Sequence, residues 1–279
     1  MNNADARLAA DRAGIADYTF LRVLGAGNHG VFYLANRPDR LHIDAELVAV
    51  KVLSGSNSQD TFRRATRELA AFAAVRSPYL VTLYDAGQQG DDLYYSMEYL
   101  PAGSLADAAG SLVQRQVLKA VSDAAWAAHA LHEAGIAHND IKPANIMLTD
   151  TGSKLSDLGL SQLLTPGLTI TGLGSAGSVE FLDPAIIRGE MPSRSTDIYA
   201  LAATLHRALT GKGMYGDLPP DNTMVAMRRV LSHPPEPSPT LPPGARDLIM
   251  TSTDPNPSVR PSTAEEFAIR VDGLADDIL

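Results

Sequence analysis

The chain has 279 residues, 45% of them hydrophobic, and its 23 Lys and Arg against 32 Asp and Glu give a formal net charge of −9. The acidic balance argues against a nucleic-acid binder, which needs a basic surface, and the absence of cysteine excludes disulfides, cysteine-ligated zinc and a cysteine nucleophile. No apolar stretch approaches the ~20 residues of a membrane span, and the first residues lack the apolar core of a secretory signal. We therefore expect no membrane span in this chain and a reducing compartment, the cytoplasm, as its location.

Residues 18–100 are expected to form a small β-rich lobe that follows an N-terminal extension at residues 1–17. β-Branched and aromatic residues between Gly, Asp and Pro turns predict strands at residues 20–24, 31–35, 47–53, 80–84 and 93–99. Apolar residues at helical spacing predict one helix between these strands, at residues 60–75.

Residues 101–279 change to a helical pattern. Apolar residues at steps of three and four predict helices at residues 113–131, 198–209, 224–231, 245–251 and 264–274. The expected fold class is therefore α+β, with a β-rich lobe, a larger helical lobe and a ligand in the cleft between them.

A glycine-rich loop opens the β-rich lobe. Gly25, Gly27 and Gly30 form a GxGxxG pattern, and glycine lets a backbone approach a phosphate closely. A dinucleotide-binding fold needs a helix after the third glycine, but a strand pattern follows here. The loop is thus interpreted as a hairpin tip over a ligand, although an ordinary hairpin turn explains the same pattern.

Lys51 lies inside the apolar strand predicted at residues 47–53. A buried lysine needs a carboxylate or phosphate partner, and Glu68 in the following helix is the candidate. The alternative is a surface lysine whose alkyl chain packs on the strand.

The loop after the long helix carries the strongest chemical signal. Asp140, Lys142 and Asn145 stand there at fixed spacing around a proline, and Asp157 follows a short strand. A carboxylate can orient a hydroxyl and accept its proton, a lysine can neutralise a transferring phosphate, and amide and carboxylate oxygens suit Mg²⁺.

Taken together and in this order, these residues resemble the eukaryotic-type (Hanks-type) protein kinase family, and the bacterial serine/threonine kinases in particular. The resemblance spans about residues 18–274. It implies a bilobal protein-kinase-like fold that forms one catalytic domain, with a kinase N-lobe at residues 18–100 and a kinase C-lobe at residues 101–279.

The resemblance also implies an activity, its cofactors and the roles of single residues. The expected reaction is transfer of the ATP γ-phosphoryl group to a Ser or Thr hydroxyl of a protein substrate, with Mg²⁺, or Mn²⁺ as the alternative ion. The implied catalytic residues are Asp140 as base, Lys142, Lys51 and Glu68, and the implied metal ligands are Asn145 and Asp157. The implied ATP-binding residues are Gly25, Gly27, Gly30, Phe32, Ala49, Lys51, Met97, Glu98, Tyr99, Leu100 and Met147. Asp197 is expected to brace the catalytic loop, and Arg260 matches a late structural arginine.

The sequence departs from the family pattern at the catalytic loop and the activation segment. Asn139 stands where many kinases have an arginine that pairs with an activation-segment phosphate, and residues 158–187 contain no Lys or Arg. The hydroxyl residues singled out in the activation segment are Thr169, Thr171, Ser175 and Ser178, and a phosphate on any of the first three would lack both local basic partners. We therefore hypothesise that activity does not require phosphorylation of the activation segment.

A second departure concerns the end of that segment. Ala185 replaces the family's glutamate, which normally pairs with the residue matching Arg260. Since a buried arginine is costly when unpaired, either Asp183 or Glu190 substitutes, or Arg260 is exposed.

Three alternatives stay open at this point. The chain can be a pseudokinase that acts as an ATP-binding scaffold, or a small-molecule phosphotransferase with a similar catalytic loop. The HxxH spacing of His129 and His132 is compatible with zinc but is interpreted as helix surface, because no third ligand is near in sequence. The sequence also leaves the oligomeric state open, a homodimer included.

Overall fold

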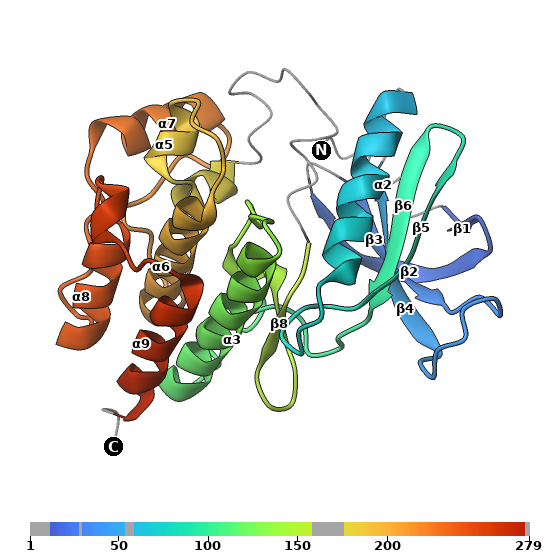
Figure 1. Ribbon diagram of the computed structural model, residues 1–279, viewed down its shortest axis with the longest axis horizontal. Coiled ribbons are helices and arrows are strands. Elements are labelled where there is room, and N and C mark those ends of the chain that lie inside the picture. Colours follow the sequence, from blue (N-terminus) through green and yellow to red (C-terminus); the bar gives the residue numbers. More distant parts are fainter. Residues whose placement is uncertain (1–11, 28–29, 54–58, 158–175, 277–279) are drawn as a thin grey trace. The chain divides into compact units, whose positions relative to one another are not determined.

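The computed structural model describes residues 12–27, 30–53, 59–157 and 176–276 (Figure 1). The described residues up to 74 together with 81–99 form one compact unit. A second unit contains residues 75–80, 100–157 and the described residues from 176 onward.

An antiparallel sheet of six strands forms most of the first unit, in the order β1-β2-β3-β4-β6-β5. Sequence neighbours pair along most of it, as expected for strands joined by hairpins. The strands are β1 Gly14–Ile15, β2 Tyr18–Gly27, β3 Gly30–Asn36, β4 Leu47–Leu53, β5 Leu83–Gln89 and β6 Asp92–Glu98. β4 is buried from its second residue to its last because it lies between β3 and β6.

One helix, α2 Gln59–Ala74, accompanies this sheet and contacts β5. Ala65, Leu69 and Phe72 are buried while the residues between them are mostly exposed. This spacing of four and three places the apolar residues on one helical face, so burial of that face against the sheet stabilises the helix.

The second unit is built around helix α3 Gln114–Glu133, which contacts α6, α9 and the β7–β8 hairpin (Figure 1). Its helices are α3, α5 Pro184–Ile187, α6 Arg194–Thr210, α7 Thr223–Ser232, α8 Pro243–Ser252 and α9 Ala264–Asp276. The shorter elements are η1 Pro143–Asn145, β7 Ile146–Leu148, β8 Ser153–Leu155, η3 Ala176–Phe181 and η4 Pro257–Val259. α6 is buried at every position from Asp197 to His206, because neighbouring elements surround it.

The predicted fold class is confirmed, and the predicted helices differ from the observed ones by a few residues at their ends. The strand predicted at residues 80–84 was wrong in its extent. Leu80 makes only an isolated parallel bridge to Leu155, and the strand proper is β5, which runs on through Gly87 to Gln89. β5 is an edge strand with many half-buried or exposed positions, so the sequence shows no apolar alternation there.

Among the helices of the described residues, none combines the length and the apolar character that crossing a membrane requires.

Candidate active site

The predicted catalytic loop lies in the second unit, directly before the β7–β8 hairpin. Both carboxylate oxygens of Asp140 lie 2.8 Å from the Lys142 ammonium nitrogen. The side-chain amide of Asn145 donates to the Asp140 carbonyl oxygen at 2.7 Å and to its carboxylate at 2.9 Å. Pro143 opens η1, and its fixed φ suits the first position of such a turn. The loop therefore gathers a carboxylate, an ammonium and an amide at one point.

The backbone of this loop is held by the buried carboxylate of Asp197, in the first turn of α6. Asp197 accepts hydrogen bonds from the backbone N–H groups of His138, at 2.7 Å, and of Asn139, at 2.9 Å. Its Oδ2 also lies 2.8 Å from Nε2 of His132 on α3. The structure thus places Asp197 where the sequence predicted a brace, and adds His132, which the sequence analysis had interpreted as helix surface but which is buried.

His138 links the loop to the strand that precedes Asp157. Its Nε2 lies 3.1 Å from the Ser156 carbonyl oxygen, and burial lowers the pKa of the imidazole, which favours the neutral ring. A neutral ring that donates from Nε2 leaves Nδ1 as an acceptor, and Nδ1 lies 3.4 Å from the Asp140 backbone nitrogen. His138 therefore has a structural role within the loop.

The two predicted metal ligands come from adjacent pieces of backbone. The Asn145 carbonyl oxygen accepts hydrogen bonds from the backbone and the hydroxyl of Ser156, at 2.8 and 3.1 Å, and Asp157 follows directly. Asp157 has a φ of +62°, a left-handed conformation that Asp tolerates better than most residues. One carboxylate and one amide oxygen, completed by substrate phosphates, form a donor set that suits Mg²⁺.

Lys142 also contacts the segment that follows the undescribed residues. Its ammonium lies 3.3 Å from the hydroxyl oxygen of Ser178 in η3. Of the four hydroxyl residues singled out in the activation segment, Ser178 is therefore joined to the catalytic loop. Thr169, Thr171 and Ser175 lie outside the described residues.

The first unit holds most of the residues predicted to bind ATP. Gly30 has a φ of +140°, and a Cβ there would lie 2.2 Å from the Val52 carbonyl oxygen, so only glycine fits. Lys51 is buried on β4, with its ammonium 4.7 Å from the centroid of the Phe32 ring. Glu68 lies at an exposed position of α2, and its pairing with Lys51 stays a prediction.

Two further residues predicted to bind ATP lie opposite each other on neighbouring strands. Ala49 of β4 pairs with Met97 of β6, and both are buried. Glu98 ends β6, and the Tyr99 hydroxyl accepts a hydrogen bond from Arg22 at 3.2 Å. The last two residues of the predicted set, Leu100 and Met147, belong to the second unit.

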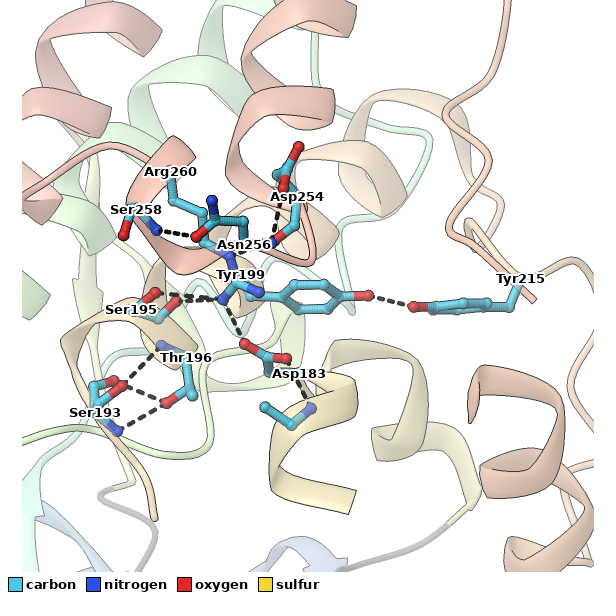
Figure 2. Close-up of polar contacts among 11 residues, drawn as sticks. Asp183, Ser193, Ser195, Thr196, Tyr199, Tyr215, Asp254, Asn256, Ser258 and Arg260 are labelled. Carbon is cyan, nitrogen blue, oxygen red and sulfur yellow. Dashed lines mark hydrogen bonds and ion pairs between the residues drawn. The ribbon is translucent and has the colours of Figure 1, made fainter. Parts of the chain in front are cut away.

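Arg260 is buried, and Asp183 is its carboxylate partner (Figure 2). Of the three options left open by the sequence, the structure shows the pairing with Asp183. Glu190 is exposed. A second ion pair of the same segment was missed by the sequence analysis: Glu180 of η3 bonds to Arg207 of α6 at 2.7 Å. Glu180 is a charged residue within the largely apolar run at 179–187, and this position was the available signal that it has an ion-pair partner.

The fold and this loop fit the class of phosphotransferase domains: one unit gathers a carboxylate, a lysine and an amide in one loop, and the other unit carries the glycine-rich hairpin. A family model of the protein kinase domain matches residues 18–269. The chain belongs to the protein kinase family.

Its relatives include bacterial serine/threonine kinases. The chain is 32% identical to the serine/threonine-protein kinase PrkC of Bacillus subtilis over 263 residues, which are 90% of this chain and 39% of PrkC. It is 33% identical to PknB of Mycobacterium leprae over 260 residues, 88% of this chain and 41% of PknB. The chain thus spans about two fifths of the length of these curated relatives. The PknI kinase domain of Mycobacterium tuberculosis shares the fold, with a TM-score of 0.68 and 24% identity over 95% of this chain and 98% of that domain.

Proposed function

We propose that this domain transfers the γ-phosphoryl group of ATP to Ser or Thr hydroxyls of protein substrates. The observation that carries the proposal is the position of Lys142, which lies within 2.8 Å of both Asp140 carboxylate oxygens and 3.3 Å from Ser178. The Lys142 ammonium therefore contacts both the candidate base Asp140 and the segment that carries Ser178. We expect a protein acceptor to lie beside this segment. The similarity to PrkC and PknB supports the same activity.

In this mechanism the side chains of the domain position the reacting groups and neutralise the negative charge of the phosphates. Asp140 orients the acceptor hydroxyl and takes its proton as the oxygen attacks the γ-phosphorus and ADP leaves. Lys142 offsets the negative charge of the transferring group, and Lys51 would hold the α- and β-phosphates. Mg²⁺ held by Asn145 and Asp157 would supply further charge neutralisation when bound. A domain that consumes ATP needs the nucleotide pool inside the cell, so we place its activity in the cytoplasm.

We further propose that activity does not require a phosphate on the activation segment. Asn139 has no charge with which to pair a phosphate, and its backbone N–H is already used by Asp197. The absence of Lys and Arg from residues 158–187 supports the same conclusion. Replacing Thr169, Thr171 and Ser175 together by alanine should leave the rate nearly intact. A hundredfold loss would contradict this part of the proposal.

One assay tests the catalytic proposal. The purified chain is incubated with labelled ATP and Mg²⁺, with and without a generic basic protein, beside the variant Asp140→Asn. Transfer of label to protein that disappears in the variant is expected. Stabilisation by nucleotide without transfer would instead indicate a pseudokinase, and turnover only with a small alcohol would indicate a small-molecule phosphotransferase.

A further inference from the structure

Arg260 is the best-buried arginine side chain that pairs with a carboxylate in the described part of the chain, with 2% of its surface exposed. Its Nη1 pairs with Asp183 and donates to the Ser195 carbonyl oxygen at 3.1 Å, and its Nε donates to the Asp254 carbonyl oxygen at 2.8 Å. The guanidinium also lies 5.4 Å from the centroid of the Tyr199 ring (Figure 2). Because a guanidinium stays protonated in proteins, this site always holds a positive charge that needs a carboxylate.

Asp183 uses its two carboxylate oxygens for two different tasks. Oδ2 pairs with Arg260, and Oδ1 accepts the backbone N–H of Ala185 at 2.9 Å, so the residue also caps α5. Only 3% of its side chain is exposed. Ala185 stands where the family has a glutamate, and it has no carboxylate. The negative charge that pairs with Arg260 is instead on Asp183, two residues earlier in the chain.

The backbone that Asp183 anchors is the backbone that carries Ser178. η3 ends at Phe181, two residues before Asp183, and the Leu182 N–H donates to the Val179 carbonyl oxygen at 3.2 Å. Val179 itself is fully buried. Between the ion pair at Asp183 and the Ser178–Lys142 contact there is thus a short, buried and internally bonded piece of chain.

We propose that Asp183 is a positioning residue for phosphoryl transfer, because its ion pair with Arg260 fixes the segment that sets Ser178 against Lys142. This proposal rests on the proposed kinase function. Asp183 acts through Ser178 and Lys142, because its own carboxylate is occupied by Arg260 and the Ala185 N–H. We call the Asp183–Arg260 ion pair the anchor. It joins two side chains of the domain itself and involves no phosphate group.

The competing explanation is that the Glu180–Arg207 ion pair alone holds the segment. Glu180 accepts two hydrogen bonds from Arg207 Nη2, both at 2.7 Å, and one from Nε at 3.0 Å. It lies closer to Ser178 than Asp183 does along the chain. If this pair suffices, then removing the Asp183–Arg260 pair leaves phosphoryl transfer unchanged.

The main test removes the ion pair without leaving a buried charge. Asp183→Ser keeps an N-cap acceptor for α5, and Arg260→Met in the same chain removes the guanidinium. For this double variant we expect kcat/KM for a protein acceptor to fall about thirtyfold, while KM for ATP stays within about twofold. Glu190→Gln, an exposed carboxylate change in the same region, serves as the matched control and should keep the parent's values.

A second cycle separates positioning from general destabilisation. Ser178→Ala should cost activity in the parent chain but cost little more in the double variant, because the Ser178 contact is already lost there. Equal costs in both backgrounds, or a folded double variant with the parent's kcat/KM, would overturn the proposal. If the double variant does not fold, Asp183→Asn decides: about a tenfold fall in kcat/KM with unchanged KM for ATP supports the proposal, and unchanged activity refutes it.

A readout without catalysis keeps this inference separate from the proposed function. Amide hydrogen exchange in η3 should rise in the double variant while exchange in α6 stays slow. If the parent chain transfers no phosphate, the kinase proposal fails, and the exchange result alone then decides whether Asp183 anchors the segment. Unchanged exchange in η3 would refute the anchor.

Discussion

The carboxylate of Asp197 should be among the most important single side chains for the stability of the second unit. It accepts two backbone N–H groups and lies within hydrogen-bond distance of the His132 ring, with 1% of its surface exposed. Hydrogen bonds to a charged group contribute about 1.5–3 kcal/mol each. Because such contributions are not additive, we expect Asp197→Ala to lower the free energy of unfolding by about 4–6 kcal/mol.

Asp197→Asn should have a smaller effect for a geometric reason. The amide NH₂ must occupy one of the two oxygen positions, and each of these positions faces a backbone N–H, of His138 or of Asn139. One buried donor is therefore left unsatisfied in either orientation, and we expect a loss of about 2–3 kcal/mol.

Denaturant unfolding followed by the fluorescence of Trp126 measures both variants. Trp126 is the only tryptophan of the chain and lies on α3, the helix that carries His132. Asp247→Ala is the control, because Asp247 is an exposed helical aspartate of the same unit in a surface ion pair with Arg270, and such pairs contribute only about 0–1 kcal/mol. If Asp197→Ala costs less than about 1 kcal/mol, or no more than Asp197→Asn, the proposed role of the three contacts is refuted.

Three further predictions concern backbone conformation and pH. Asn139 has a φ of +67°, so Asn139→Val should destabilise the chain by about 1–2 kcal/mol in chemical denaturation while Asn139→Gly stays within about 0.5 kcal/mol of the parent. Gly30→Ala should lower the melting temperature, since its Cβ would lie 2.2 Å from a carbonyl oxygen, whereas Gly25→Ala, with no protein atom within 4 Å of its Cβ, should keep the melting temperature of the parent. Burial raises the pKa of Tyr215 to about 12, so the folded state holds this proton more tightly than the unfolded state, with its pKa near 10. Stability that is fully present below pH 10 should be lost as pH rises toward 12, and Tyr215→Phe should reduce that slope in denaturation curves measured across this range.

Local sequence patterns were enough to predict the long helices and most strands of this fold, but not β1, α5 or the extent of β5. α3 and α6 have long apolar periodicity, and Gly211, which follows the last residue of α6, has a φ of +70° and forms a left-handed C-cap. The catalytic loop could be predicted because Asp140, Lys142 and Asn145 lie within six residues of one another, and the structure brings their side chains into contact.

The charged pairings of the second unit could not be predicted in the same way. Asp183 and Arg260 are 77 residues apart, and His132 and Asp197 are 65 apart. Hydrophobic periodicity states which face of an element is buried, but it does not state which polar residue of another element lies opposite. For Arg260 the sequence could only require a carboxylate, and the choice between Asp183 and Glu190 depends on how α5 and η4 pack.

Asn139 shows how a side chain can differ from the family pattern while the backbone conformation of the loop is kept. The loop needs a backbone at this position with a positive φ and a free N–H for Asp197, and asparagine provides both at low cost. Within the described part of the chain, the buried Oδ1 of Asn139 has no hydrogen-bond partner, so its side chain is not what holds the loop. The contacts that order the catalytic loop therefore come from Asp197, on a helix of the same unit. The Asp183–Arg260 and Glu180–Arg207 pairs likewise join the segment that carries Ser178 to other elements of the same unit.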